Sequence, residues 1–356
     1  MSNNCSNNVS PNITTFFAHI STAEAVAVGF EGLTTLLLIF IFLNDCFHFK
    51  RESSTSSRLQ SILIIQLSYV AYSTSSFLAI ISPRSSTLAE LAFIVYFSFT
   101  LKELMSLMLH YLGGADYAVG HLGGLQARIS VTPFACMCSY CCPKVYFNKK
   151  FVMFIKIGVY QSAILHPIFD FISAFLWTNG LYLDSDLSLT SPSLYFVIVE
   201  KVSILIAMYA ITSLYWTARK ELDPHHINGK FLTVQALMVI SGFQEFAFNI
   251  LTKFGLIQCK GILNAADRAA VLHHFAVVPE MLILYVISCY FHRQPLGEEF
   301  EIPSQRSTSL LTTNHASYDS TSDGETDPLL DPPVCNGNYN VQVQPRGTNQ
   351  LKIQSI

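Results

Sequence analysis

Long apolar runs separated by short polar stretches make up most of this chain. Each run has at least about 20 residues, the length that an α-helix needs to cross about 30 Å of hydrocarbon. The runs lack the short alternating segments of a transmembrane barrel, so their backbone groups must be paired within helices. We therefore expect an all-α polytopic membrane protein with seven transmembrane helices, at residues 25–47, 59–82, 88–112, 151–177, 193–216, 231–251 and 271–291.

The composition supports this interpretation. Of the 356 residues, 51% are hydrophobic and 13% are charged, whereas about 25% of a soluble domain is charged. An ordinary soluble enzyme is therefore excluded, and a net charge of −3 provides no broad basic surface for capturing nucleic acid. We expect one seven-helix domain over residues 25–291, without a large soluble domain.

Lysine and arginine are unevenly distributed between the predicted spans. The first, third and fifth connections and the tail carry 14 of them, the other connections carry four, and the first 24 residues carry none. Because cytoplasmic loops retain positive residues, the amino terminus is predicted outside and the carboxyl terminus in the cytoplasm. Residues 1–24 also lack the basic start and apolar core of a cleavable signal peptide.

The predicted extracellular segment 1–24 contains three N-x-S/T triplets, the second weakened by a proline, at Asn4, Asn8 and Asn12. An outside position would make them candidates for N-glycosylation. Such triplets also arise by chance in a stretch this rich in Asn, Ser and Thr.

The last segment, residues 292–356, is polar, rich in Ser, Thr and Pro, and without a sustained helical period. This composition predicts a disordered cytoplasmic tail. Within it, Glu325, Leu329 and Leu330 have the spacing of an acidic dileucine sorting signal, which a coat adaptor would bind and which would route the protein through endosomes. Chance occurrence is the alternative for so short a motif.

Four of the nine cysteines lie within residues 136–143, after the third span, at Cys136, Cys138, Cys141 and Cys142. Thiols on the cytoplasmic side stay reduced, and two adjacent cysteines crowd a tetrahedral zinc site, so a disulfide scaffold and a metal site are both disfavoured. Thiols beside basic residues at the membrane are typical of S-palmitoylation, which would bind this loop to membrane lipids. Cys5 and Cys259 are predicted outside and could pair.

Ionisable side chains inside the spans are few and costly. Each costs at least about 2.5–3.5 kcal/mol at bilayer depth, so it should face the bundle interior, pair or change protonation. The candidates are six carboxylates and two lysines, together with titratable histidines: Glu31, Lys102, Glu103, Asp170, Glu200, Lys201, Glu245, Glu280, His110, His166, His273 and His274. The excess of carboxylates argues against a simple anion path and leaves neutral or cationic solutes open.

Helical spacing decides which of these side chains share a face. Seven residues turn through about 700°, so Glu103 and His110 share one face, and His273 and Glu280 share another. His274 lies about 120° from Glu280, so these two need not converge.

Two prolines and two lysines add further expectations. Pro167 and Pro279 each remove a backbone donor and should bend their helices, and Glu280 follows the second proline near the midplane, where transporters tend to bind solutes. Because adjacent residues diverge by about 100° on a helix, Lys102 and Lys201 are expected to pair with carboxylates of other spans.

The predicted solute pathway combines polar residues of the third, fourth, sixth and seventh spans. For the glutamines, interhelical hydrogen bonding that only holds the bundle together is the alternative. The candidates are Glu280, His274, His273, Gln161, Gln235, Gln244, His110 and Glu103.

Several motifs resemble one known family. They are the 136–143 cysteine cluster shortly after Gly113 and Gly114, Gly158-Val-Tyr-Gln161, Asn228-Gly-Lys230-Phe231, and His274 with Glu280. Over about residues 25–293 the chain resembles the organic solute transporter alpha-subunit family. The cysteine run is thinner than in the best-known members, and His110 stands where a glutamate is expected.

The resemblance implies facilitated, bidirectional passage of amphipathic solutes such as steroid conjugates and bile acids across the plasma membrane. It also implies a single-span beta-type subunit as partner. We expect a transporter subunit and not an enzyme, without cofactor, catalytic or metal-binding residues, because Walker, H-E-x-x-H and G-x-S-x-G motifs are missing. A seven-helix receptor and a membrane-trafficking or membrane-organising protein without solute flux are the alternatives.

Overall fold

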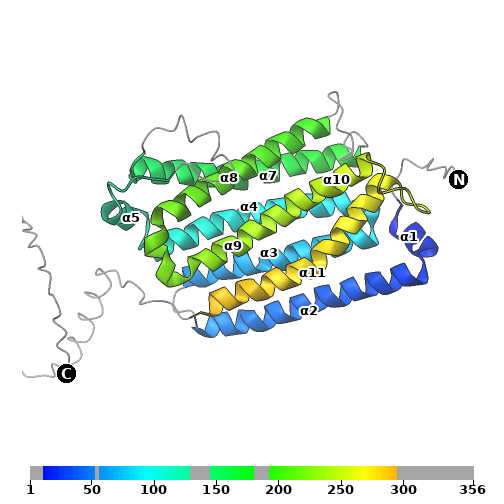
Figure 1. Cartoon of the computed structure of the whole chain (residues 1–356), viewed down its shortest axis with the longest axis horizontal. Coiled ribbons are helices and arrows are strands. Elements are labelled where there is room, and N and C mark those ends of the chain that lie inside the picture. The colour runs from blue at the N-terminus through cyan, green and yellow to red at the C-terminus, as the bar shows by residue number, and fades with distance from the viewer. Residues whose placement is uncertain (1–10, 53–55, 129–144, 180–191, 295–356) are drawn as a thin grey trace, which may run out of the picture. The chain divides into compact units, whose positions relative to one another are not determined.

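The computed structural model describes residues 11–52, 56–128, 145–179 and 192–294. Within these residues, seven helical segments are long and apolar enough to cross a membrane, which confirms the predicted all-α, seven-span class (Figure 1). The spans are α2 (Thr22–Glu52), α3 (Ser56–Ile81), α4 (Ser86–Tyr111), α7 (Lys149–Thr178), α8 (Pro192–Leu222), the sixth span from α9 (Ile227–Val239) through α10 (Glu245–Lys253), and α11 (Ala265–Arg293).

Two short helices mark the two ends of the bundle. α1 (Ile13–His19) precedes the first span, and α5 (Ala115–His121) follows the third (Figure 1). The ends are called the α1 end and the α5 end below. α1 lies within the predicted extracellular segment, where Asn12 caps it by accepting a hydrogen bond from the Thr15 backbone N–H at 2.9 Å.

Polar caps extend several helices beyond their apolar runs. The Asn148 side chain accepts a hydrogen bond from the Phe151 N–H at the start of α7, and Asn264 does the same for Asp267 at the start of α11. Such caps satisfy backbone donors that the first turn of a helix leaves free. The seventh helix therefore begins six residues before the predicted span 271–291.

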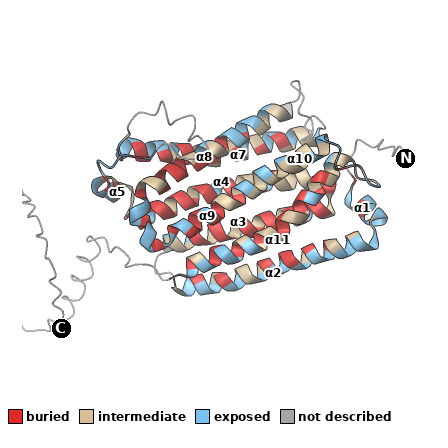
Figure 2. Cartoon of the chain, viewed as in Figure 1, coloured by how far each residue is buried: buried red, intermediate tan, exposed pale blue. Residues whose placement is uncertain are grey.

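The helices differ in how much of their surface they bury. α4 packs against α3, α7 and α8, whereas α2 packs against α3 and α11 at the edge of the bundle. Figure 2 shows α2 mostly exposed and α4 mostly buried. The exposed side chains of α2 are large and apolar, for example Phe30, Leu33, Phe40 and Phe47, as expected for a helix that faces lipid.

Two glycines permit close approach between helices. A Cβ atom at Gly158 of α7 would lie 3.0 Å from the Ala210 Cβ of α8. At Gly229 of α9 it would overlap the ring of Phe291 on α11. Small residues at such crossings let helix backbones pack tightly where no hydrophobic effect drives association.

The sixth span differs from the single α-helix expected over 231–251. A π-helical segment, η3 (Ile240–Gln244), interrupts it between α9 and α10. Single π turns widen a helix locally and are frequent at functional sites. Pro167 and Pro279, where bends were expected, lie inside α7 and α11, which remain helical on both sides of them.

Candidate functional site

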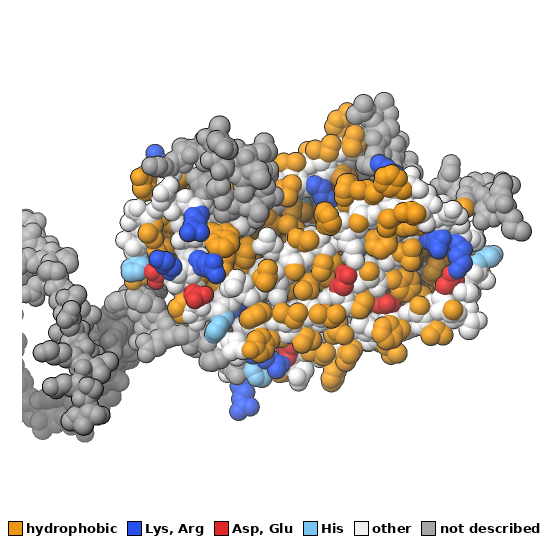
Figure 3. All heavy atoms as spheres, viewed as in Figure 1, with side chains coloured by type: hydrophobic (Ala, Val, Ile, Leu, Met, Phe, Trp, Pro, Cys, Tyr) orange, Lys and Arg blue, Asp and Glu red, His pale blue; other side chains and the backbone are white. Residues whose placement is uncertain are grey.

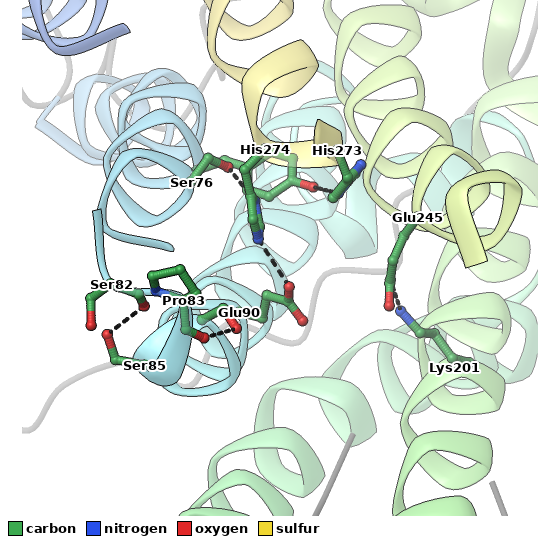
Figure 4. A network of polar contacts seen from close by, with 11 residues as sticks. Ser76, Ser82, Pro83, Ser85, Glu90, Lys201, Glu245, His273 and His274 are labelled. Carbon is green, nitrogen blue, oxygen red and sulfur yellow. Dashed lines mark hydrogen bonds and ion pairs between the residues drawn. The ribbon is translucent and has the colours of Figure 1, made fainter. Parts of the chain in front are cut away.

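A network of polar side chains joins α3, α4 and α11 (Figure 4), near the end of α3 and the starts of α4 and α11. His274 of α11 is its centre and is 1% exposed. Its Nε2 atom lies 3.1 Å from Glu90 Oε1 of α4, and its Nδ1 atom lies 3.3 Å from Ser76 Oγ of α3. One histidine therefore links two neighbouring helices to the seventh span.

The adjacent histidine extends the network. His273 Nε2 lies 3.3 Å from the Tyr72 hydroxyl of α3, and the Tyr72 ring stacks on Phe93 of α4 with centroids 3.9 Å apart. His273 and Tyr72 are each 3% exposed. A stacked ring fixes the position of the Tyr72 hydroxyl, so the His273 ring is held from α3 and not only from its own helix.

An ion pair connects α8 to α10. Lys201 Nζ lies 3.4 Å from Glu245 Oε2, and the two side chains are 46% and 38% exposed (Figure 4). At about 1.5 Å per residue, Lys201 lies about 13 Å from the start of α8 at Pro192, and Glu245 lies about 12 Å from the end of α10 at Lys253. This depth is within the hydrocarbon of a bilayer, where an exposed charge facing lipid is costly.

Gln244 and Glu280 form the deepest part of the network. Gln244 Nε2 donates to Glu280 Oε1 at 3.1 Å, which joins the sixth span to the seventh. η3 ends at Gln244, so this hydrogen bond comes from the last residue of the π turn and the ion pair of Glu245 from the residue directly after it. Among the described residues, Glu280 Oε2, Gln244 Oε1 and His273 Nδ1 have no hydrogen-bond partner.

Buried polar atoms in proteins are nearly always hydrogen-bonded, so these three spare atoms, like the other buried polar atoms without a partner in the described residues, are available for further hydrogen bonds. The carboxylate and amide oxygens accept hydrogen bonds, and the imidazole nitrogen donates or accepts according to its tautomer. Together with the ion pair, they offer both signs of charge and both hydrogen-bonding roles. The chemistry suits a polar or charged group of a solute or several waters.

The polar network, defined as Tyr72, Ser76, Glu90, Lys201, Gln244, Glu245, His273, His274 and Glu280, contains four of the eight predicted pathway residues. These are Glu280, His274, His273 and Gln244. As the helical spacing indicated, His274 and Glu280 do not converge, because each bonds to a different helix.

The other glutamines lie elsewhere. Gln161 Nε2 donates to the Ser203 carbonyl oxygen at 3.1 Å, an interhelical bond between α7 and α8. Gln235 is partly buried on α9, nine residues before Gln244, and makes none of the hydrogen bonds that join the network. The Gln161 contact therefore fits the alternative role of the glutamines, an interhelical hydrogen bond that holds two spans together.

Glu103 and His110 have different surroundings although they were expected to share a face. Glu103 is buried and accepts from Ser61 Oγ at 2.8 Å, whereas His110 is exposed at the end of α4. Lys102 pairs with its sequence neighbour Glu103 at 3.0 Å, so the expectation that it would pair with another span is wrong. The long flexible side chain of Lys102 spans the angle between adjacent helix positions. The same expectation for Lys201 is confirmed, because Lys201 pairs with Glu245 of another span.

Lys230 also requires a correction. It was counted with the fifth connection, but α9 begins at Ile227 and buries Lys230 to 1% exposure. Its ammonium donates to the Tyr111 hydroxyl at 3.2 Å and to the His225 carbonyl oxygen at 3.1 Å. The helix starts one turn earlier than the apolar run, and this places a cation among the helices near the α5 end.

Sequence analysis missed Glu90, Tyr72 and Ser76. Glu90 stands two residues inside the predicted third span and was left out of the intramembrane carboxylates, although a carboxylate within an apolar run was the available signal. Tyr72 and Ser76 carry no such signal, because tyrosine and serine occur throughout the spans without special meaning.

Several predicted modification residues lie outside the described residues: Asn4, Asn8, Cys136, Cys138, Cys141, Cys142, Glu325, Leu329 and Leu330. Asn12 is described and is exposed at the start of α1. Across the described parts of the chain, no group of three or more His, Cys, Asp or Glu residues is placed to hold a metal ion.

Comparison with known proteins gives one consistent family. Residues 27–295 match the family described as Organic solute transporter Ostalpha. The chain is 27% identical to organic solute transporter subunit alpha of Bos taurus over 271 residues, which are 75% of this chain and 79% of that protein. It is 24% identical to the Homo sapiens subunit over 272 residues, or 76% and 80% of the two chains. No solved structure matches it.

Proposed function

This chain belongs to the organic solute transporter alpha family and is a multi-pass membrane protein of a solute transporter, and from this premise we propose that it moves amphipathic organic solutes across the plasma membrane. The solutes are of the steroid-conjugate or bile-acid kind. Transport is facilitated, so the solute gradient supplies the driving force. A single-span beta-type subunit is the proposed partner.

The Lys201–Glu245 pair is the observation that carries this proposal. An ion pair whose side chains are 46% and 38% exposed at bilayer depth is stable when water or a polar solute reaches it and is costly when lipid does. Glu245 directly follows Gln244, whose Nε2 donates to Glu280. We infer that the solute passes here, with its polar group on the network and its apolar body along the surrounding apolar helices.

The excess of carboxylates is compatible with an amphipathic solute. Glu90 and Glu245 lie near His274 and Lys201 respectively, at 3.1 Å and 3.4 Å, and Glu280 accepts from Gln244. The three carboxylates are therefore each engaged by a hydrogen-bonding or cationic partner. A solute hydroxyl or amide would bond to the spare atoms without meeting a row of free negative charges.

Orientation and location belong to the same proposal. The amino terminus and the α1 end face outside, and the carboxyl terminus faces the cytoplasm. Cys259, in the connection between α10 and α11, is disulfide-bonded, and disulfides persist in oxidising, extracellular environments, which supports this orientation. Glycosylation, palmitoylation and endosomal sorting through a coat adaptor remain proposals on residues outside the bundle.

The test measures uptake of a labelled steroid sulfate in cells that produce the chain with a single-span partner. Glu280→Gln is expected to lower uptake about tenfold at unchanged surface delivery, because a charge-assisted hydrogen bond contributes about 1.5–3 kcal/mol. Glu221→Gln, at an exposed carboxylate near the α5 end, is the matched control and should transport normally. Uptake that is independent of the chain for several amphipathic solutes would remove the proposal.

A further inference from the structure

A cavity of about 330 Å³ lies between α2 and α11 near the α5 end. It is separate from the polar network, because none of its lining residues belongs to that network. Its volume is at the lower end of about 300–1,000 Å³ for small-molecule sites. Among its lining residues are Ile41, Asp45, Tyr285, Val286, Tyr290 and Arg293.

The polar end of the cavity is built around one buried carboxylate. Asp45 of α2 is 1% exposed and receives hydrogen bonds from the Tyr285 hydroxyl at 2.8 Å and Cys289 Sγ at 3.1 Å. Arg293 forms an ion pair with the same carboxylate, and its side chain is 44% exposed. The carboxylate and the guanidinium cancel, so this end is neutral but keeps guanidinium N–H groups that face outward.

The cavity extends from the level of the lipid headgroups into the hydrocarbon of the bilayer. Arg293 is the last residue of α11, and Lys50 and Arg51 lie in the last turn of α2, which places this end near the headgroups. Val286 is seven residues deeper on α11, about 10 Å, where the surroundings are hydrocarbon. An occupant would therefore be polar near Arg293 and apolar near Val286.

Three lining residues of α11 form a known spacing. Val286, Tyr290 and Arg293 follow the pattern of an aliphatic residue, a tyrosine and a basic residue that has been proposed for cholesterol contact. By itself this pattern is weak. Here all three of its residues line one cavity, and Tyr290 and Val286 are largely exposed on the helix surface.

We propose that the cavity between α2 and α11 binds a membrane sterol, with the sterol hydroxyl at Arg293 and the ring system against Ile41, Val286 and Tyr290. A hydroxyl accepts from the outward guanidinium N–H groups without disturbing the neutral Asp45–Arg293 pair. A lipid phosphate would bring net charge close to the Asp45 carboxylate, and an acyl chain would leave the polar end without a partner. The sterol would bridge the peripheral helix α2 to α11.

The experiment uses the full chain in phosphatidylcholine vesicles that contain a photoreactive, clickable cholesterol analogue. After illumination, labelled peptides of α2 and α11 are identified by mass spectrometry. Val286→Phe fills the cavity and is expected to reduce this labelling about tenfold, equivalent to about 1.4 kcal/mol. Ile283→Phe is the matched control, because Ile283 is exposed on the same helix at 59% but does not line the cavity.

Competition distinguishes a membrane sterol from a transported steroid. Displacement of the label by cholesterol but not by a steroid sulfate supports the proposal. Equal labelling of the Val286→Phe and Ile283→Phe variants overturns it, as does displacement by the steroid sulfate, with or without displacement by cholesterol. The labelling does not depend on solute flux, so it stands or fails separately from the proposed transport function.

Discussion

At the scale of single residues, two adjacent histidines direct the polar network to different helices. His273 reaches Tyr72 of α3, whereas His274 reaches Glu90 of α4 and Ser76 of α3. Successive positions on a helix diverge by about 100°, so neighbours in sequence serve different neighbours in space. Each pairing also satisfies a polar group that would be costly alone in the low-dielectric interior.

The Lys201–Glu245 pair leads to a prediction on what happens to uptake when one or both of its charges are reversed. Lys201→Glu places two carboxylates opposite each other between α8 and α10, so uptake of a labelled steroid sulfate should fall about tenfold or more, as for an interaction of about 1.4 kcal/mol. The exchanged double variant, Lys201→Glu with Glu245→Lys, should recover part of the uptake, because it restores an opposite-charge pair. A double variant as inactive as the single one, at equal surface amounts, would contradict a role for the pair itself.

At the scale of elements, the sixth span is what brings the site together. α9 and α10 both pack on α11, and η3 between them sets the rotation of the residues that follow it. The π turn ends at Gln244, so the hydrogen bond to Glu280 comes from its last residue and the ion pair with Lys201 comes from the residue directly after it. A regular α-helix over the same residues would turn Gln244 and Glu245 toward different neighbours.

The crossing of α9 and α11 gives a second prediction. Gly229→Ala adds a methyl group that overlaps the Phe291 ring, so the variant should be destabilised by about 1–3 kcal/mol, the usual range for overpacking. Thermal unfolding in detergent, followed by size-exclusion chromatography, measures the loss.

Gly29→Ala is the control for this variant. Gly29 lies inside α2 with nothing within 4 Å of an added Cβ, and alanine is the better helix former. The Gly29 variant should therefore be as stable as the parent or slightly more so. Equal unfolding temperatures of the Gly229→Ala variant and the parent would contradict the prediction, because α9 and α11 would then accommodate the added methyl group without loss of stability.

At the scale of the whole molecule, the described surface is that of a membrane protein. Apolar side chains are spread along the visible face, and most of the basic side chains lie toward the two ends (Figure 3). The ion pairs Lys260–Glu24, near the α1 end, and Lys149–Asp116, near the α5 end, are well exposed. Charges at both ends and an apolar middle are the distribution that a bilayer selects.

The predicted orientation leads to a topology experiment. An epitope tag at the amino terminus should be detected on intact cells, and one at the carboxyl terminus only after permeabilisation, because the basic connections stay in the cytoplasm. Endoglycosidase should also increase the gel mobility of the parent chain but not of a variant with Asn4, Asn8 and Asn12 changed to glutamine. Both tags on the same face would contradict seven spans, and reversed tags would contradict the orientation.

Much of the bundle could be predicted from sequence because hydrocarbon imposes a simple requirement. A segment must be about 20 residues long, apolar and internally hydrogen-bonded to cross, and these are properties that can be counted along a chain. The ends were less certain. Asn264 and Lys230 are both polar residues at the ends of apolar runs. Asn264 caps α11, whereas Lys230 lies buried in α9, because helices continue past the hydrocarbon.

The order of residues along the chain is enough to predict the class of the protein, its seven crossings and the set of polar residues that these crossings must accommodate. Which of these residues contact each other follows from the packed fold, because the partner of a side chain depends on the rotation of its helix and on the helix beside it. His274 and Glu90 lie 184 positions apart, and no spacing along one helix relates them. The pairing of Lys102 with its neighbour Glu103 and the π turn at η3 have a different cause. Both depend on local geometry that an apolar pattern does not encode.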